Sequence, residues 1–591
     1  MFARTKTWLV CALSAAALVA CGGDDGQPGA AGAPGAPGAP GMDAVGHLIS
    51  ISVEGRSVSQ GYNVSAAEIV AFEKTTGRIF AVNAQSGKID VYDASTAAKI
   101  AALGNPSESI DLRVMMVANG VAGSVNVVGP ANSVSTSGNL VAVTVEANPK
   151  TDNGWVVFLN ATTRAFVRAV SVGALPDMLT FTPDGTKVLV ANEGEPNVGY
   201  TADPEGSVSV ISVSDFSVAT IRFTDFNVGG SRNAELPLSK MVISGVGATV
   251  AQDLEPEYIA VRSDSREAYV SLQEASAIAV LDLTTNTVKK IIGMGFKDFS
   301  IPGNELDVSR NDGVNLKTWP VMGMYQPDSI AAYTVNGRTY VVTANEGDSR
   351  EDWLAGVSQA ACEASGYYFS GQCRDEITLR DAVTTAPALA ATLSAELAAY
   401  SASADTTLGR MTFSFSATKQ KNGATVTRLY AYGARSFAIW DTQTGERVFD
   451  SAGDFERITA NRYGNLFNQD HNGGSLVGDR RSNSKGPEPE GLTLGQINGR
   501  TYAFIGLERM GGVMVYDISN SNAPSFVQYL NNRNINVAPN AAAVAAGSDL
   551  GAEGLTFVTA ADSPDNMPRL IVGNEVSGTT TVYRVDVTPL R

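Results

Sequence analysis

Short stretches of alternating apolar and polar residues dominate the chain after about residue 48, and turn residues bound each stretch. A run such as Val188-Leu189-Val190, with polar neighbours, is typical of a β-strand that packs against a core. The PDG triplet at 183–185 and the NGR triplets at 336–338 and 498–500 are hairpin turn sequences. The pattern predicts an all-β fold of short antiparallel strands.

A phrase of about 40 residues recurs along this part of the chain. It opens with an acid after Pro or Ala, continues through two apolar strands joined by a Gly-containing turn, and closes on a third strand. Five clear copies begin at Pro176, Pro256, Pro327, Pro489 and Ala552, and two degenerate copies span residues 68–93 and 134–160. One such sheet cannot bury both of its faces, so the copies must ring a common axis. We predict a β-propeller of about seven blades over residues 47–591, with six or eight blades as alternatives. The strand near residue 50 is expected to complete the last blade and close the ring.

Two longer segments interrupt the repeat, at residues 290–325 and 349–410. The second contains the Ala-rich stretch 386–402, whose composition predicts a helix, so we expect one helical insertion. It also contains Cys362 and Cys373, which enclose a short Gly/Ser/Tyr loop. In an exported protein such a pair predicts a local disulfide.

The first 46 residues differ in character from the rest. An apolar run follows Arg4 and Lys6 and is too short to span a membrane, which is typical of a signal peptide over residues 1–20. The run ends in LVAC, which resembles the bacterial lipobox, so we predict that Cys21 is lipidated. Residues 21–46 carry Gly at every third position with Pro between, the collagen period. We expect a semi-rigid spacer, with a weak trimerising stalk as the alternative. The protein is then exported and anchored by lipid to the outer membrane or cell surface, its only membrane contact.

Composition narrows the choice of partners. Hydrophobic residues make up 44% of the chain and charged residues 17%, and the net charge is -17. Such an acidic surface repels phosphate backbones, so we expect no nucleic-acid partner. It does not repel cations, and acidic loops suit Ca²⁺.

Six longer phrases carry a family resemblance. VANEGEPN, DPEGSVSV, KDFSIPGNELD, NEGDSRED, KGPEPEGL and GNEVSG occur in this order. Together they resemble the choice-of-anchor I propellers, which include the mesenchyme-specific cell surface glycoprotein group, over nearly everything after residue 48. The resemblance implies a surface propeller held by a variable anchor, and it transfers no catalytic residue. Some family members are labelled alkaline phosphatase-like or phytase-like. Asn483 stands where the family pattern leads us to expect Asp.

Acidic residues recur at equivalent places in the repeat, and those places come round a propeller axis at similar depth. Asp177, Glu257, Asp328, Glu490 and Glu553 open first strands, and Glu193, Glu346, Glu508 and Glu575 follow second strands. Carboxylates that meet at one channel mouth need cations, arginines or N–H groups. Arg350 and Arg509, which follow the same strands, are the alternative partners to a metal ion. We predict calcium as cofactor and name as metal ligands Glu193, Glu346, Asp348, Glu490, Glu553 and Glu575. The alternative is that these acids only cap strand ends and turns.

Two functions remain open. The first is a binding or adhesion module that recognises an unknown surface ligand, with the cation at the channel mouth. The second is a metal-dependent phosphoesterase acting on a phosphorylated small molecule, in which Arg350, Lys485 and Arg509 are the predicted ligand-binding residues. Other catalytic classes have little support, because the chain has two histidines and neither a P-loop nor a GxSxG motif.

Two local motifs carry weaker signals. His471 is a hypothetical lone acid or base, since it stands in a polar, Gly-rich run. The segment Asp307–Gly313 resembles a calcium loop, but its Gly is one place late for an EF-hand and no closing Glu follows. A tight Asx turn is the favoured interpretation.

Overall fold

The computed structural model describes residues 47–350, 352–402 and 406–589. By contacts the chain divides into two units, Met1–Ala44 and Val45–Arg591. The signal peptide, the Cys21 lipidation site and the spacer predicted before residue 47 lie outside the described residues. Among the described helices, none has the length and apolar character needed to cross a membrane.

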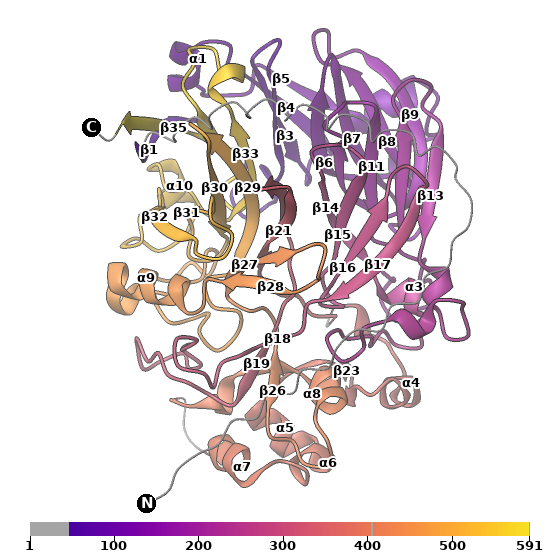
Figure 1. The fold of residues 1–591 in the computed structure, drawn as a ribbon, viewed down its shortest axis with the longest axis vertical. Coiled ribbons are helices and arrows are strands. Elements are labelled where there is room, and N and C mark those ends of the chain that lie inside the picture. Colours follow the sequence, from indigo (N-terminus) through magenta and orange to yellow (C-terminus); the bar gives the residue numbers. More distant parts are fainter. Residues whose placement is uncertain (1–46, 351, 403–405, 590–591) are drawn as a thin grey trace, which may run out of the picture. The chain divides into compact units, whose positions relative to one another are not determined.

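Seven four-stranded antiparallel sheets contain most of the strand residues in the described part of the chain, which confirms the predicted propeller (Figure 1). Blades 1 to 3 consist of β2 (Val70–Glu73), β3 (Arg78–Asn83), β4 (Lys88–Asp93) and β5 (Glu108–Asp111); β6 (Val128–Ser137), β7 (Leu140–Ala147), β8 (Asn153–Asn160) and β9 (Phe166–Ala174); β10 (Pro176–Phe181), β11 (Lys187–Asn192), β12 (Ser207–Ser212) and β13 (Val218–Arg222). Blades 4 and 5 consist of β14 (Pro256–Val261), β15 (Glu267–Leu272), β16 (Ala277–Asp282) and β17 (Thr287–Gly293); β20 (Ile330–Val335), β21 (Arg338–Asn345), β27 (Ser436–Asp441) and β28 (Arg447–Asp450). Blades 6 and 7 consist of β29 (Pro489–Ile497), β30 (Arg500–Leu507), β31 (Val513–Asp517) and β32 (Ser525–Leu530); β33 (Ala552–Val558), β34 (Arg569–Asn574), β35 (Thr579–Pro589) and β1 (His47–Arg56).

The blades form a closed ring. The first strand of each blade contacts the first strand of the next, and β2 of blade 1 contacts β33 of blade 7. The last blade takes its outer strand from the other end of the described chain, because β1 pairs with β35 from His47↔Pro589 to Arg56↔Thr581. This closure confirms the role predicted for the strand near residue 50. It also covers a sheet edge that would otherwise expose unpaired backbone groups.

Turn residues fix the register of the hairpins. The NG pairs at 336–337 and 498–499 sit in two-residue loops, and both of their residues have positive φ, between 48° and 77°. Such φ values define the turns whose twist matches that of paired strands. Apolar side chains of adjacent sheets then pack together, as where Leu189 and Val208 of blade 3 share a buried cluster with Val270 of blade 4. The apolar residues of the alternating pattern are therefore the ones that pack between neighbouring blades.

The two insertions fold together rather than separately, and the second is longer than predicted, since it runs from the end of β21 at Asn345 to the start of β27 at Ser436. A small sheet of β18 (Phe296–Asp298), β19 (Val321–Met324) and β26 (Leu429–Ala431) joins them, and Phe299, Trp319 and Phe413 belong to their common core. Around it lie α4 (Gln359–Ala364), α5 (Leu379–Thr385), α6 (Pro387–Ala390), α7 (Ala395–Ala402), α8 (Phe415–Lys421) and the short strands β22 (Tyr368–Phe369), β23 (Cys373–Arg374), β24 (Glu376–Thr378) and β25 (Thr412–Ser414). Figure 1 shows these helices gathered at the lower end of the view.

The helical insertion is confirmed, with one difference in detail. The Ala-rich stretch 386–402 forms two short helices, α6 and α7, instead of one. Between them Leu393 makes a bridge to Val426, and the Ser394 hydroxyl accepts a hydrogen bond from Leu397 N at 3.2 Å. Tertiary pairing and a new N-cap therefore break the helix that composition favours. Cys362 and Cys373 form the predicted disulfide.

The remaining helices lie between blade strands. They are α1 (Ala97–Ala101), α2 (Leu112–Ala118), α3 (Val250–Asp253), α9 (Asp454–Tyr463) and α10 (Ala541–Ala545). Of these, α9 is the one that matters for the channel, because the chain after it runs through residues 464–488 into blade 6. Several charged side chains at the channel mouth come from that segment.

Candidate functional site

A repeated irregularity of the first strands positions the acids. In blades 3, 4, 6 and 7 the pairing with the second strand shifts just after the opening residue, as between Pro176 and Leu179. The acid of each phrase lies inside this bulge, and bulges re-aim the side chains they contain. Neighbouring bulges are also close: a Cβ added at Gly491 would lie 1.5 Å from the Glu553 carbonyl oxygen. Only glycine permits that approach, so the acids of adjacent blades converge.

A cavity of about 680 Å³ lies where these bulges meet. Its polar lining includes Glu68, Asn132, Asp177, Asp328 and Glu553, together with Glu146, Glu193 and Glu195. The first five come from five different blades and occupy the same place in the repeat, with Asn132 as the one amide. We call this cavity and the carboxylates around it the mouth. The convergence predicted from the repeat is therefore present in the structure.

Glu193, Glu257 and Glu274 form the first group of mouth acids, and all three are buried. One carboxylate oxygen of each lies within 4.8 Å of the others, and the residues are 8%, 8% and 7% exposed. Among the described residues, Oε2 of Glu257 and Oε2 of Glu274 have no hydrogen-bond partner. Burial and the neighbouring carboxylates raise the pKa of Glu257 well above its usual value, and burial raises that of Glu274 to about 8. Three buried acids, two of which carry an oxygen without a hydrogen-bond partner, are a donor set that suits a hard cation.

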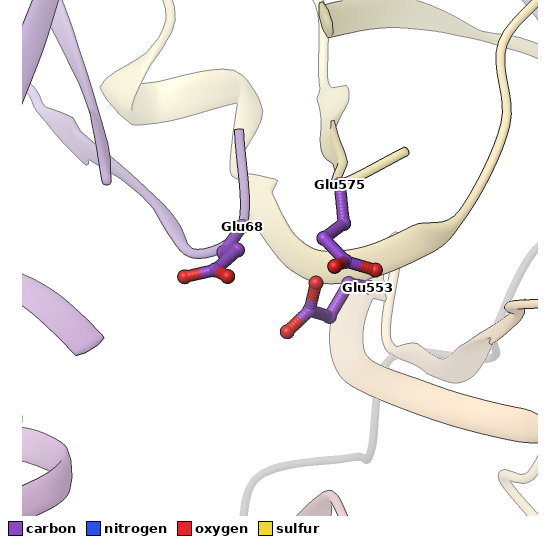
Figure 2. A group of neighbouring side chains, drawn as sticks. All are labelled: Glu68, Glu553 and Glu575. Atoms are coloured by element: carbon purple, nitrogen blue, oxygen red, sulfur yellow. The ribbon is translucent and has the colours of Figure 1, made fainter. Parts of the chain in front are cut away.

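Glu68, Glu553 and Glu575 form a second group, contributed by blades 1 and 7 (Figure 2). Glu575 Oε1 accepts a hydrogen bond from Ser65 Oγ at 2.6 Å, while Glu553 Oε2 has no partner among the described residues. Burial and the Glu575 charge raise the pKa of Glu68 to about 8, and the same two causes raise that of Glu553 well above normal. The group is half-buried and opens on the cavity.

Glu346, Glu488 and Glu508 form a third group, and this one is neutralised by the protein itself. Lys485 Nζ contacts Glu346 and donates to the Gly347 carbonyl at 2.7 Å. Arg481 Nη2 lies 2.6 Å from Glu488, and Arg509 Nε lies 3.0 Å from it. Burial alone would raise the pKa of Glu488, but Arg481, Lys485 and Arg509 together lower it well below its usual value.

The predicted ligand-binding residues therefore already have partners. Lys485 and Arg509 belong to the third group. Arg350 is 4% exposed and pairs with Glu255 at 2.5 Å and with Asp253 at 3.4 Å. All three side chains compensate the protein's own carboxylates.

The other predicted metal ligands divide between the groups. Glu193 belongs to the first group, Glu553 and Glu575 to the second, and Glu346 to the third. Glu490 lies between them, with an unpartnered Oε2, and burial and the charges of Glu508 and Glu346 raise its pKa well above normal. Asp348 lines a small side cavity with Glu274 and Arg350.

Sequence reasoning missed three residues of these groups. Glu68 opens the degenerate first copy of the repeat, so aligning that copy with the last one would have found it. Glu274 comes one place later than the equivalent acid of other blades, after Gln273. Glu488 stands before the repeat phrase begins, and the only sequence signal for it is that Glu488-Pro489-Glu490 repeats Glu255-Pro256-Glu257 of blade 4.

Both ring nitrogens of His471 have hydrogen-bond partners within the protein. Its Nε2 lies 2.6 Å from Arg509 Nη1 and its Nδ1 lies 3.4 Å from the Glu508 carbonyl oxygen. Burial and the Arg509 charge lower the pKa of His471 to about 3, so the ring is neutral and accepts at Nε2. Both nitrogens are occupied by the protein, which does not favour a role as acid or base. Asn483 donates to the Arg410 carbonyl at 3.1 Å and thereby links the segment to the insertion.

The family follows from comparison with known proteins. The family model described as the choice-of-anchor I domain matches residues 68–521. The chain belongs to this family. The match begins at Glu68, the first mouth acid along the chain, and ends within blade 6, between β31 and β32. The family's domain therefore contains most of the mouth acids.

Two curated relatives are more distant. Gigasin-3a of Magallana gigas is 27% identical over 187 residues, which cover 31% of this chain and 66% of the relative. The mesenchyme-specific cell surface glycoprotein of Strongylocentrotus purpuratus is 24% identical over 294 residues, covering 46% of this chain and 36% of the relative. The chain thus spans less than two thirds of either relative.

Solved structures with a similar course of the chain include three at low identity. A Kuenenia stuttgartiensis hydrazine synthase chain has a TM-score of 0.42 at 12% identity and covers 88% of this chain and 96% of that chain. The β-propeller domain of Myceliophteria thermophila Cps50 (Swd1) has a TM-score of 0.39 at 7% identity, covering 90% and 99%. A mitotic checkpoint complex chain has a TM-score of 0.39 at 8% identity, covering 94% and 98%.

Proposed function

We propose that this protein is a cell-surface propeller that binds its ligand through a Ca²⁺-type cation held at the mouth. The observation that carries the proposal is the unequal distribution of positive charge there. Lys485, Arg481 and Arg509 neutralise the third group of acids, whereas no lysine or arginine pairs with Glu257, Glu274 or Glu553 among the described residues. Buried carboxylates that lack an internal partner require either protons or an external cation.

The surroundings of these acids suit a bound ligand as well as a metal. Ca²⁺ takes six to eight oxygen ligands, and a site built from a few carboxylates leaves positions open. Glu193 of the first group and Glu68 and Glu553 of the second group line the cavity of about 680 Å³, which is within the range of small-molecule sites. Hydroxyl or carboxylate oxygens of a surface ligand can complete the coordination.

The surface location rests on two supports. The family name describes a domain attached by different anchors, and one relative is named a cell surface glycoprotein. The lipobox at Cys21 and the Gly/Pro spacer would provide such an anchor in this chain.

Isothermal titration of the purified chain with Ca²⁺ tests the cation, with Mg²⁺ as the comparison because Mg²⁺ demands a tighter octahedral site. We expect Ca²⁺ binding that weakens in Glu257→Gln and Glu274→Gln. Binding that is absent, or that is unchanged in both variants, would refute the proposal.

The phosphoesterase alternative is tested separately. In that hypothesis Arg350, Lys485 and Arg509 hold the phosphate beside the metal, and all three side chains are committed to ion pairs within the protein. Ca²⁺-loaded protein is therefore expected to leave p-nitrophenyl phosphate and phytate intact. Hydrolysis above the blank that Glu257→Gln abolishes would replace the binding proposal with the enzymatic one.

A further inference from the structure

A fourth group of acids lies outside the mouth, where the first insertion meets the segment before blade 6. Asp307 and Asp312 belong to the calcium-like run in the sequence, and Asp479 comes from more than 160 positions later. One carboxylate oxygen of each of the three lies within 4.8 Å of the others. The run that lacked a closing acid in sequence thus acquires one in space.

Backbone amides hold the carboxylates in place. Asp307 accepts from Ser309 N at 3.1 Å and from Asn315 N at 2.8 Å. Asp479 Oδ2 accepts from Asp312 N at 3.2 Å and from Gly313 N at 3.1 Å. Both segments are therefore fixed relative to each other with their acids facing one another.

An unsatisfied atom marks this group as more than a set of turns. Asp479 is 3% exposed, and its Oδ1 has no hydrogen-bond partner among the described residues. A buried carboxylate oxygen without a donor is a large electrostatic penalty unless a cation supplies the missing charge. Asp307 is fully buried beside it.

No side chain of the described chain supplies that charge. None of the ion pairs formed by the described residues includes Asp307, Asp312 or Asp479, although Arg310 and Arg480 are their neighbours in sequence. Arg435 comes near, since its Nη1 donates to the Asp307 carbonyl at 2.9 Å, but its charge is paired with Glu456 at 2.6 Å.

We propose that Asp307, Asp312 and Asp479 bind a second divalent cation of the Ca²⁺ class, which joins the first insertion to the segment 464–488. Each of the three carboxylates offers one oxygen to the group, and the Ser309 hydroxyl contacts Asp312 beside them. Water or carbonyl oxygens would complete the six to eight ligands that Ca²⁺ takes. This site is distinct from the mouth and does not depend on the function proposed for it.

The proposed site also affects the mouth, because the segment 464–488 supplies two of the positively charged side chains there, Arg481 and Lys485. Arg435 Nη2 donates to the Ser482 and Ser484 carbonyls at 2.7 and 2.6 Å, next to Arg481 and Lys485. A cation at Asp479 holds the start of this stretch, so it orders the residues that neutralise the third group of mouth acids. Its loss is expected to loosen the segment while the blades stay folded.

Hydrogen exchange measured by mass spectrometry on the full chain tests the proposal, with Ca²⁺ or EGTA present. At Ca²⁺ about ten times its Kd, exchange through local opening is expected to slow about tenfold in peptides covering 305–316 and 464–486. Asp479→Asn and the exposed Asp312→Asn should abolish this protection and remove one Ca²⁺ per chain in titration.

Two further variants separate the sites. Glu257→Gln alters the mouth and should leave the protection of both segments intact, and Glu235→Gln, on an exposed 3₁₀ turn, should behave as the unaltered chain. Asp312→Asn guards against misfolding of the buried Asp479→Asn variant, since its position is on the surface. Protection that is absent in the unaltered chain, or that persists in Asp312→Asn and Asp479→Asn, would overturn the second site.

Discussion

Replacing Glu257 by Gln is expected to stabilise the cation-free protein, although it alters a buried residue. Glu257 is 8% exposed, its Oε2 has no partner, and Glu274 and Glu193 crowd it with like charge. Gln has nearly the same shape and no charge. It therefore removes repulsion without opening a cavity.

The size of the effect follows from the protonation of Glu257. At pH 8 the unfolded carboxyl, with its ordinary pKa of 4.5, is ionised. The folded carboxyl must either take up a proton or remain charged, and full protonation costs about 5 kcal/mol at 1.36 kcal/mol per pH unit. Structural relaxation around Glu257 avoids part of this cost. We therefore expect Glu257→Gln to raise the free energy of unfolding by about 1–3 kcal/mol. Because the pKa of Glu257 is raised in the folded state, the unaltered chain loses stability as the pH rises from 5 to 8. The stability advantage of Glu257→Gln should therefore nearly vanish at about pH 5.

Glu488→Gln, also at the mouth, is the matched control variant, for which we expect a loss of stability. Glu488 is fully buried, and it accepts hydrogen bonds from Arg481 Nε at 2.8 Å and from Arg509 Nε at 3.0 Å. The substitution removes the ion-pair partner of Arg481 and one of the partners of Lys485 and Arg509, so this variant should lose about 3–5 kcal/mol.

Thermal unfolding in EGTA at one scan rate measures both variants. For a domain of more than 500 residues the unfolding entropy is about 1 kcal/mol/K, so Tm should rise by about 1–3 °C in Glu257→Gln and fall by about 3–5 °C in Glu488→Gln. Saturating Ca²⁺ should shrink or reverse the advantage of Glu257→Gln, because only the unaltered chain gains fully from binding. If both variants lose stability equally in EGTA, the division of the mouth into compensated and uncompensated acids is wrong.

Three other outcomes are expected. Ca²⁺ affinity should rise between about pH 6 and pH 8.5, because mouth carboxyls whose pKa lies at about 7 or 8 must release protons when the ion binds. Calorimetric titration in buffers of different ionisation enthalpy counts the released protons, and zero release would contradict a carboxylate site. Cys362→Ser should open the loop closed with Cys373 and lower local stability by about 2–3 kcal/mol, seen as faster proteolysis within the insertion, while Ca²⁺ binding at the mouth stays unchanged. Gly491→Ala should lower Tm by about 1–3 °C and weaken Ca²⁺ binding, because its Cβ would collide with the Glu553 carbonyl, whereas Gly423→Ala meets open space and should do neither.

Much of the fold is determined by the sequence because blade signals are local. Strand alternation, the NG turns at 336–337 and 498–499 and the period of the repeat all arise from neighbouring residues, and they predict seven blades together with closure by the strand near residue 50. The break between α6 and α7 was not predictable, because Leu393 pairs with Val426, a residue from a distant part of the insertion.

The recurrence of acids at one end of the blades was likewise determined by the sequence, since equivalent positions in a ring must converge. Which acids keep their own positive partners was decided only by the tertiary structure. Lys485 belongs to no repeat unit, and it reaches Glu346 because the segment 464–488 packs against the end of a blade 5 strand. Arg481 pairs with Glu488 within the segment itself. Asp479 joins Asp307 because the same segment also meets the first insertion. Coulomb interactions depend on distance in space, and long connections between blades set those distances without leaving a periodic trace in the sequence.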